Sequence, residues 1–378
     1  MIKGLNKKVM FAYFILLLLF PIFYITNSSA VPLNRGVGSY TVTTIAGSGM
    51  KGLLDGYQDR AQFNWPTGVA IDRKGNFYIA DFANNVIRRI NSNGEVTTFV
   101  GSGHAAFGDG KGRKAHLKGP DNIAIGSDGS LYVADADNFR IRKVVSDGSI
   151  NTIAGSGIKG YKDGSAKTAR FAYPTGVAVD KDDNVYVADR GSHTIRKIMP
   201  DGNVSTIAGN GFPGYADGKS NMTHFKEPIS VAVDHAGNVY VADSGNNSIR
   251  KIMPDGTVTT LAGNQQHGYK DGTGKDALFA WPTGIAVDGA GNIYLCDSQN
   301  SRIRRITADG VVSTVAGISI PGFADGPGYS AQFNFPTGIE VDKAGNIYVA
   351  DSGNNRIRKV SQGGILQATL SVAGANVE

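Results

Sequence analysis

The chain has 378 residues, of which 41% are hydrophobic and 19% are charged, a composition that excludes intrinsic disorder as the default state. A single cysteine, Cys296, excludes an internal disulfide framework, and the 51 glycines follow no three-residue period, which excludes a collagen-like fibre. The formal net charge is +6, but three lysines fall in the first 30 residues without any acidic residue, so the remainder carries only +3 and gives little support to a nucleic-acid partner.

Residues 1–30 have the pattern of a targeting signal rather than of a folded element. Three lysines precede an uncharged apolar run over residues 9–25, and Ser28 and Ala30 offer a small-x-small cleavage site. We expect a cleaved signal peptide; the alternative is an uncleaved signal anchor, because the apolar run can just span a bilayer. Both interpretations place the rest of the chain outside the cytoplasm, in an extracellular or periplasmic compartment.

Internal repeats of 54 residues organise the rest of the chain. The Asp that ends each YIAD, YVAD or YLCD segment recurs at this spacing, at Asp81, Asp135, Asp189, Asp243, Asp297 and Asp351. The first Arg of the IRK or IRR segments keeps the same spacing, at Arg88, Arg142, Arg196, Arg250, Arg304 and Arg358. No insertion separates the copies, so each copy is one structural unit.

Each repeat reads as four short strands joined by turn residues, for example 176–180, 184–189, 194–198 and 203–209. The turns are too short for anything but antiparallel neighbours, and inner strands that are apolar throughout suit burial on both faces. The sequence therefore predicts an all-β fold, a six-bladed β-propeller with four-stranded antiparallel blades.

A seventh copy of the fourth strand, residues 41–47, precedes the first full repeat. We expect this N-terminal strand to complete the last blade and close the ring. The predicted domains are a signal segment at 1–30, the propeller at 31–364 and a C-terminal tail at 365–378. The alternative is that this tail, as an extra edge strand, occupies the position of the N-terminal strand in the last blade.

The segments PTGIAVD, GNIYVAD, NNRIRKV and VTTIAG resemble the NHL repeat, and the resemblance covers residues 41–360. The long connections are similar to repeats in the extracellular propeller of teneurins, although only the repeat transfers. The resemblance implies the fold but no single function. The axial histidines of the NHL-fold peptidyl amidating lyase cannot be placed here, whereas streptogramin lyase and gluconolactonase-like propellers stay open by fold analogy.

Several recurring residues are expected to be structural. The aromatic or leucine plugs between blades are Phe63, Leu117, Phe171, Phe225, Phe279 and Phe333. The Asp81 series is expected to close a turn and receive the Arg seven residues later, while the basic residues of the third strand are expected to point outward. The loop aspartates, Asp55, Asp109, Asp163, Asp217, Asp271 and Asp325, suit either turn chemistry or calcium, and turn chemistry is the better fit.

The candidate site comes from positions where the repeats differ. The residue before the repeat proline reads Trp65, Gly119, Tyr173, Glu227, Trp281 and Phe335, and blade 2 has Asp121 and Asn122 where most copies have Thr-Gly. The predicted ligand-binding residues are Trp65, Asp121, Asn122, Tyr173, Glu227, Trp281 and Phe335. Aromatic walls with two carboxylates suit a sugar, a peptide or a cationic ligand, unless the rings merely pack on the loops.

Two functional classes remain open. The first is a secreted, monomeric binding or scaffold module that engages a protein, peptide or glycan partner through its long-loop face. The second is a propeller enzyme of the lyase, lactonase or hydrolase type, with Asp121 and Glu227 as candidate acid-base groups at the pore mouth. The sequence assigns no catalytic residue, metal, cofactor or nucleic-acid partner, and a membrane only if the anchor is retained. The six histidines do not converge, and Cys296 is expected to be a buried core thiol.

Overall fold

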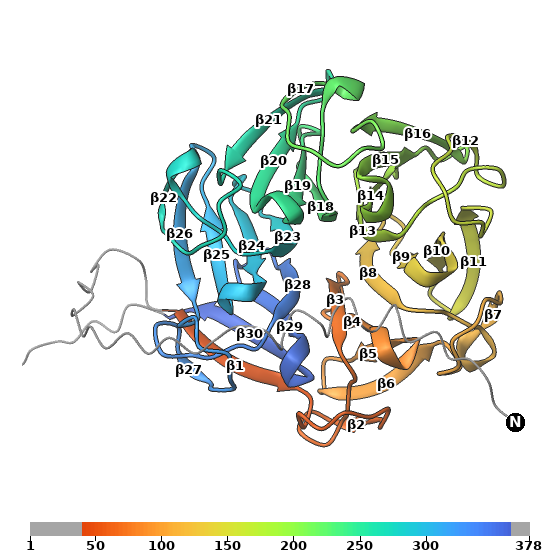
Figure 1. Ribbon diagram of the computed structural model, residues 1–378. Helices are drawn as coiled ribbons and strands as arrows, with labels where there is room; N and C mark the ends of the chain where they lie inside the picture. Colours follow the sequence, from red (N-terminus) through yellow and green to blue (C-terminus); the bar gives the residue numbers. More distant parts are fainter. Residues whose placement is uncertain (1–39, 364–378) are drawn as a thin grey trace, which may run out of the picture. The chain divides into compact units, whose positions relative to one another are not determined.

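The computed structural model describes residues 40–363, which form six β-sheets arranged around a ring (Figure 1). All strand pairs within the sheets are antiparallel, and each sheet has five strands. The predicted six-bladed β-propeller is confirmed, but each blade has one strand more than expected. The extra strand is a two-residue segment of the inter-blade connection that adds to the outer edge of the blade it leads into.

The strands of blades 1 to 6 occupy equivalent positions. The innermost strands are β3 (Pro66–Ile71), β8 (Pro120–Ile125), β13 (Pro174–Val179), β18 (Pro228–Val233), β23 (Pro282–Val287) and β28 (Pro336–Val341). The second strands are β4 (Phe77–Asp81), β9 (Leu131–Asp135), β14 (Val185–Asp189), β19 (Val239–Asp243), β24 (Ile293–Asp297) and β29 (Ile347–Asp351). The third strands are β5 (Val86–Ile90), β10 (Arg140–Val144), β15 (Thr194–Ile198), β20 (Ser248–Ile252), β25 (Arg302–Ile306) and β30 (Arg356–Gln362).

The outer strands complete each blade. The fourth strands are β6 (Glu95–Val100), β11 (Ser149–Ala154), β16 (Asn203–Ala208), β21 (Thr257–Ala262), β26 (Val311–Ala316) and, in blade 6, β1 (Tyr40–Ala46). The two-residue fifth strands are β2 (Gly56–Tyr57), β7 (Gly110–Lys111), β12 (Gly164–Ser165), β17 (Gly218–Lys219), β22 (Gly272–Thr273) and β27 (Gly326–Pro327).

Short 3-10 turns are the helical elements of the described residues. Those between the second and third strands are η2 (Phe82–Asn84), η4 (Ala136–Asn138), η5 (Arg190–Ser192), η7 (Ser244–Asn246), η9 (Ser298–Asn300) and η10 (Ser352–Asn354). Those in the connections are η3 (Gly112–Lys114), η6 (Ser220–Met222) and η8 (Gly274–Asp276). Within residues 40–363, no helix has the length and apolar character that crossing a membrane requires.

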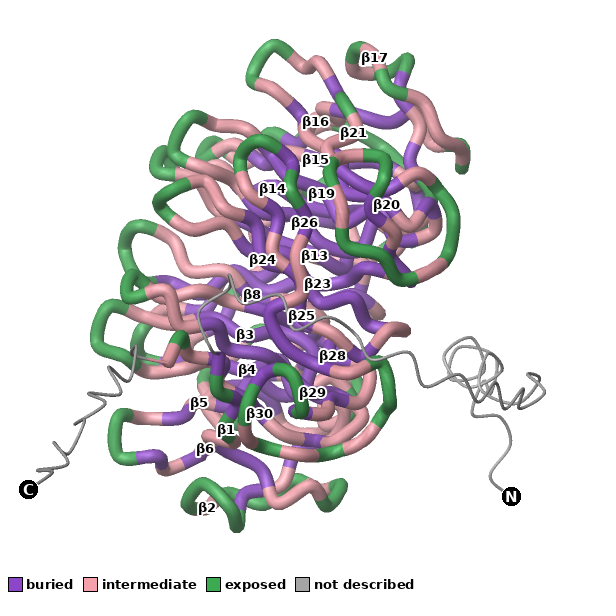
Figure 2. Tube along the Cα trace, turned by 90° about the vertical axis from the view of Figure 1, so that its left-hand side faces the viewer, coloured by how far each residue is buried: buried purple, intermediate pink, exposed green. Residues whose placement is uncertain are grey.

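The core lies between neighbouring blades, because the inner strands are buried on both faces (Figure 2). One cluster joins Val69 and Ile79 of blade 1 to Tyr348 and Ala350 of blade 6, with Phe63 between them. All six predicted plug residues are fully buried: Phe63, Leu117, Phe171, Phe225, Phe279 and Phe333. Their role as packing between blades is confirmed.

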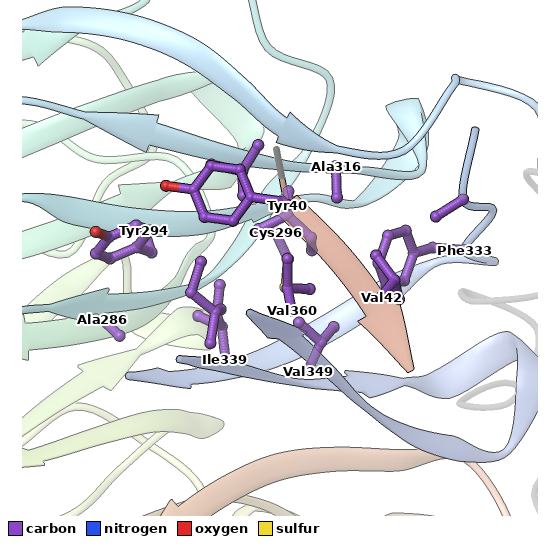
Figure 3. Packing of buried hydrophobic residues seen from close by; sticks show 14 residues of the cluster. Tyr40, Val42, Ala286, Tyr294, Cys296, Ala316, Phe333, Ile339, Val349 and Val360 are labelled. Atoms are coloured by element: carbon purple, nitrogen blue, oxygen red, sulfur yellow. The ribbon is translucent and has the colours of Figure 1, made fainter. Parts of the chain in front are cut away.

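The ring closes through the N-terminal strand, as predicted. In blade 6, β1 pairs with β30 of the C-terminal repeat, and Tyr40 and Val42 pack against Phe333 and Val349 in the same cluster (Figure 3). Innermost strand β28 also packs against β3 of blade 1. The predicted signal segment at 1–30 and the tail at 365–378 lie outside the described residues.

Candidate functional site

The long connections between blades and the 3-10 turns between the second and third strands lie on the same face of the propeller, as the strand directions predicted. The side-chain amide of Asn84 in η2 donates to the Gly52 carbonyl of the preceding connection at 2.7 Å. The equivalent bond in blade 2 joins Asn138 to Ala106 at 3.0 Å. We call this side of the ring the long-loop face.

A buried ion-pair network supports this face in every blade. In blade 1, Arg88 bonds Asp81 at 3.0 Å through Nη1 and Asp55 at 2.9 Å through Nη2. The prediction that the Asp81 series receives the Arg seven residues later is confirmed. The prediction that these arginines point outward is wrong: all six are fully buried, because carboxylates and loop carbonyls bind the two terminal nitrogens, as they do for Nη1 and Nη2 of Arg88.

The loop aspartates bind the buried arginines, and most of them also bind a threonine of the fourth strand. Besides Arg88, Asp55 accepts the Thr98 hydroxyl at 3.0 Å and contacts Arg113 at 2.8 Å. Among residues 40–363, no group of three or more His, Cys, Asp or Glu side chains could hold a metal ion. The loop carboxylates therefore serve the ion-pair network of the blades.

The inner rim of the long-loop face repeats one hydrogen bond between neighbouring blades and breaks it twice. The Thr67 hydroxyl donates to the Asp121 carbonyl of the next blade at 2.6 Å. Equivalent threonines bond the next blade from blades 3, 5 and 6, namely Thr175, Thr283 and Thr337. Blades 2 and 4 have Asp121 and Ile229 at this position, so this threonine bond is lost at the junctions of blade 2 with 3 and of blade 4 with 5.

The same two blades also lose the glycine that follows. A Cβ on Gly68 would lie 2.9 Å from the Asn122 Cα of the next blade, which shows that the innermost strands approach closely there. Gly176 and Gly284 face the same constraint, but blades 2 and 4 carry Asn122 and Ser230. The inner rim therefore departs from sixfold symmetry at two junctions.

Residues before the repeat proline also deviate in backbone conformation. Trp65, Glu227, Trp281 and Phe335 have φ between 49° and 58°, the left-handed region that is rare for residues other than glycine. Tyr173 does not adopt this left-handed conformation, and its backbone N–H donates to Asp189 at 2.9 Å. An unusual backbone thus sets the direction of four of the predicted site residues.

Arg190 of η5 connects these residues across several blades. Its Nη2 and Nε lie 2.7 and 3.3 Å from Glu227 Oε2, at the start of blade 4. The guanidinium carbon lies 5.8 Å from the centre of the Trp281 ring of blade 5. Its charge also acts on the Asp121 carboxyl of blade 2. We call Asp121, Asp137, Arg190, Glu227 and Trp281 the mouth cluster.

Two carboxyls of blade 2, those of Asp121 and Asp137, have raised pKa values. Desolvation raises the pKa of Asp121 to about 7, although the Arg190 charge opposes this change and the Asp137 charge adds to it. Desolvation also raises the pKa of Asp137, against the charge of Lys118. The pKa of Asp121 therefore lies near neutral pH, mainly because its carboxyl is desolvated.

The structure brings only some of the predicted site residues together. Trp65 and Phe335 contact each other, with ring centres 5.8 Å apart. Asp121, Glu227 and Trp281 belong to the mouth cluster. Asn122 instead lies against Gly68 of blade 1, and Tyr173 bonds Asp189 within blade 3. The gap that Gly119 leaves is occupied, because a Cβ there would lie 3.1 Å from both Asp137 and Phe82.

Sequence reasoning missed Arg190, Asp137 and Phe82. A signal existed, since the residue after the series Asp reads Ser in blades 4 to 6 but Phe82, Ala136 and Arg190 in blades 1 to 3. In the later blades this serine bonds the next blade, as Ser298 does to the Pro336 carbonyl at 2.6 Å. Arg190 replaces such a structural serine with a charge. The predicted burial of Cys296 is confirmed, and burial raises the pKa of its thiol.

The repeat belongs to a known class. The model of the NHL repeat matches residues 63–90, 171–198, 225–252, 279–306 and 333–360, which lie in blades 1 and 3 to 6. The chain is therefore a six-bladed β-propeller in which five blades contain NHL repeats. The matched segments do not include the equivalent residues of blade 2.

Curated relatives contain this propeller within longer chains. Protein SUPPRESSOR OF QUENCHING 1, chloroplastic, of Arabidopsis thaliana is 32% identical over 70% of this chain and 27% of its own length. Teneurin-3 of Mus musculus is 28% identical over 85% of this chain and 13% of its own. NHL repeat-containing protein 2 of Gallus gallus is 28% identical over 78% and 46%. The chain spans less than half the length of these relatives.

Solved structures share the fold at low identity. An auxiliary nutrient binding protein from Bacteroides thetaiotaomicron has a TM-score of 0.66 and 19% identity, covering 86% of this chain and 76% of that one. A streptogramin B lyase has a TM-score of 0.53 and 15% identity, covering 86% and 98%. A gluconolactonase from Xanthomonas campestris has a TM-score of 0.56 and 13% identity, covering 84% and 88%. At these identities the likeness concerns the fold alone.

Proposed function

We propose that this chain is a binding propeller that holds a ligand at the mouth cluster on its long-loop face. The observation that carries the proposal is the position of Arg190, which bonds Glu227, lies near the Trp281 ring and acts on Asp121, so that one side chain links four blades. Carboxylates, a guanidinium and an aromatic ring fix the orientation of a polar ligand such as a sugar or a peptide. A nutrient-binding role in a fold neighbour is consistent with this class of function.

Loss of the mouth cluster should separate binding from folding. Arg190→Ser introduces the residue that blades 4 to 6 carry at the same position, so the fold should tolerate it. A thermal-shift screen with cell-wall glycans and peptides tests the proposal, because a specific ligand stabilises the native state by mass action. We expect Arg190→Ser and Trp281→Ala to abolish the shift and Lys275→Ala to keep it. A ligand shift that survives both mouth variants would contradict the proposed site.

Charged residues are distributed unevenly among the inter-blade connections of the long-loop face. The connections at 101–119 and 155–173 each contain four Lys or Arg and one Asp, whereas the connection at 317–335 contains one Asp and no basic residue. Exposed apolar side chains, Ile158 and Tyr161, lie among the lysines of the second connection. We propose that the partner carries negative charge where it approaches blades 2 and 3.

A charge-reversal pair tests this part of the proposal. We expect binding of poly-L-glutamate to fall when Lys159 and Lys162 are both changed to Glu, and to weaken with salt. The matched control changes Lys270 and Lys275, in a connection with two basic and two acidic residues. Equal losses in the two double variants would show that net charge alone governs the binding.

An enzyme is the second candidate, and the pKa of Asp121 near 7 favours it. A carboxyl that titrates near neutral pH beside an arginine can act as a general acid or base. The lyase and the gluconolactonase with the same fold make a streptogramin B and a gluconolactone the first substrates to assay. Turnover that Asp121→Asn abolishes without a change in melting temperature would establish this class, and a full screen without turnover would reject it.

We also propose that the propeller acts outside the cytoplasm after removal of residues 1–30. This follows from the charge and hydropathy pattern of that segment. Mass measurement of the protein recovered from its expressing host would give an N-terminus near residue 31. A full-length mass in the membrane fraction would instead support the signal anchor.

A further inference from the structure

Side chains at the ends of the 3-10 turns hold the residues that precede the next blade. Asn247 Oδ1 accepts the backbone N–H of Trp281 at 2.9 Å, and Asn355 Oδ1 accepts that of Trp65 at 2.9 Å. Asn85 accepts the N–H of Gly119 at 3.0 Å. Every residue held in this way has a left-handed backbone. The asparagine acceptor therefore accompanies the conformation that aims the mouth residues.

His193 takes the place of this asparagine in blade 3. Its Nδ1 accepts the backbone N–H of Glu227 at 3.1 Å, and Glu227 has a φ of 49°. A backbone N–H can only be accepted by a ring nitrogen without a proton, so this bond requires neutral His193 with its proton on Nε2. The same geometry thus depends on pH in blade 3 but not in blades 1, 4 and 6.

The other two blades show what the acceptor contributes. Blade 2 has Phe139, which offers no acceptor, and its partner Tyr173 lies outside the left-handed region and turns its N–H to Asp189. Blade 5 has Ser301, and within the described residues Phe335 keeps a φ of 50° without such a bond. The acceptor therefore favours the left-handed conformation, and the loop contributes the rest.

The groups around His193 define how it responds to acid. Burial lowers the pKa of His193, as do the charges of Arg190 and Lys226, while the Glu227 and Asp189 carboxylates oppose this. Protonation therefore takes place below the ordinary value of 6.5. The side chain of Glu227 is at the same time the partner of Arg190.

We propose that His193 is a positioning residue that makes the Arg190–Glu227 pair sensitive to acid. Once Nδ1 is protonated, it and the Glu227 N–H are two donors facing each other, so Glu227 leaves its left-handed conformation and its carboxylate leaves Arg190. The guanidinium then loses its bonds to the Glu227 carboxylate, and its position relative to Asp121 and Trp281 changes. This proposal rests on the proposed function, since it names the regulation of the same mouth cluster, but its structural part applies to the protein without ligand.

The test uses Trp281 fluorescence in the free protein. The chain has two tryptophans, so Trp65→Phe leaves Trp281, beside Arg190, as the single reporter. Asp121→Asn is added to this background so that the Asp121 carboxyl does not titrate in the same range. Between pH 8 and pH 5 we then expect the emission to shift in one transition with a midpoint below 6.5. In the same background His193→Asn supplies the acceptor of blades 1, 4 and 6, and we expect the pH 8 emission to persist to pH 5.

Two further measurements make the outcome decisive. His235→Asn changes an exposed histidine in a turn between first and second strands and should leave the transition unaltered. His193→Asn should match the parent in melting temperature at pH 8 and exceed it at pH 5. An unchanged transition in His193→Asn would overturn the proposal. Because no ligand is needed, failure here is distinguishable from failure to find a ligand.

Discussion

Val42 of β1 lies opposite Val360 of β30, so the first described strand is the fourth strand of the last blade. Both side chains are fully buried in the cluster that also contains Phe333 and Cys296. The two ends of the described chain therefore meet in one sheet, and the ring is closed by non-covalent contacts alone.

Removal of β1 should unfold the protein. A variant without residues 31–47 loses the buried side chains of Tyr40, Val42 and Ala46 and leaves blade 6 without its fourth strand. We expect it to lose cooperative thermal unfolding and to elute as aggregate in size-exclusion chromatography. A variant without residues 365–378 should melt within a few degrees of the parent. The reverse pattern would show that the tail closes the ring.

The buried ion pairs should be unequal in their contribution to stability. Asp81→Asn leaves the fully buried Arg88 without its buried counter-charge, and we expect it to lower the free energy of unfolding by about 3 to 5 kcal/mol. Asp55 is partly exposed, so water can replace it in Asp55→Asn, and the loss should be near 1 kcal/mol. Urea unfolding compares the two variants, and equal losses would contradict this division.

Glu340 should make the propeller less stable as pH rises. It stands on β28 where the other blades have Ala70, Ala124, Ala178, Ala232 and Ala286. Desolvation raises its pKa from an ordinary 4.5 to about 7, opposed by the Val341 N–H. The native state thus keeps a proton that the unfolded chain releases between these values, so stability falls as pH rises through that window.

Glu340→Ala tests this expectation. It should stabilise the protein by about 3 kcal/mol at pH 8 and have little effect at pH 4. Chemical denaturation at the two pH values measures the difference. A constant effect across the range would show that packing, rather than the charge, distinguishes this position.

Asp121→Thr should raise the free energy of unfolding and abolish ligand binding. It restores the threonine of blades 1, 3, 5 and 6, whose hydroxyl bonds the next blade, and it removes a partly buried carboxyl. We expect a gain of about 1 kcal/mol together with loss of ligand binding at the mouth cluster. Calorimetry with and without the ligand found in the screen checks both effects, and a stabilised variant that still binds would exclude Asp121 from the site.

The sequence alone is enough to predict the propeller, because 54-residue periodicity, strand-length apolar runs and turn residues recur without a gap from Thr41 to Val360. It also identified the closing strand and the plug residues, since both are repeated local patterns. The sequence did not predict the two-residue fifth strands. A pair such as Gly110–Lys111 has no strand pattern of its own and forms a strand only by pairing with β11.

The contacts between blades depend on the folded ring and could not be predicted from the repeat pattern. The alternation of arginine with isoleucine predicts that these arginines face the solvent. They are buried instead, because Arg88 and its equivalents form ion pairs with carboxylates more than 30 residues away in the sequence. Arg190, Glu227, Trp281 and Asp121 come from four repeats, and closure of the ring brings them to one mouth. Periodicity describes what the repeats share, whereas a site depends on where single residues depart from it and on which departures the fold places side by side.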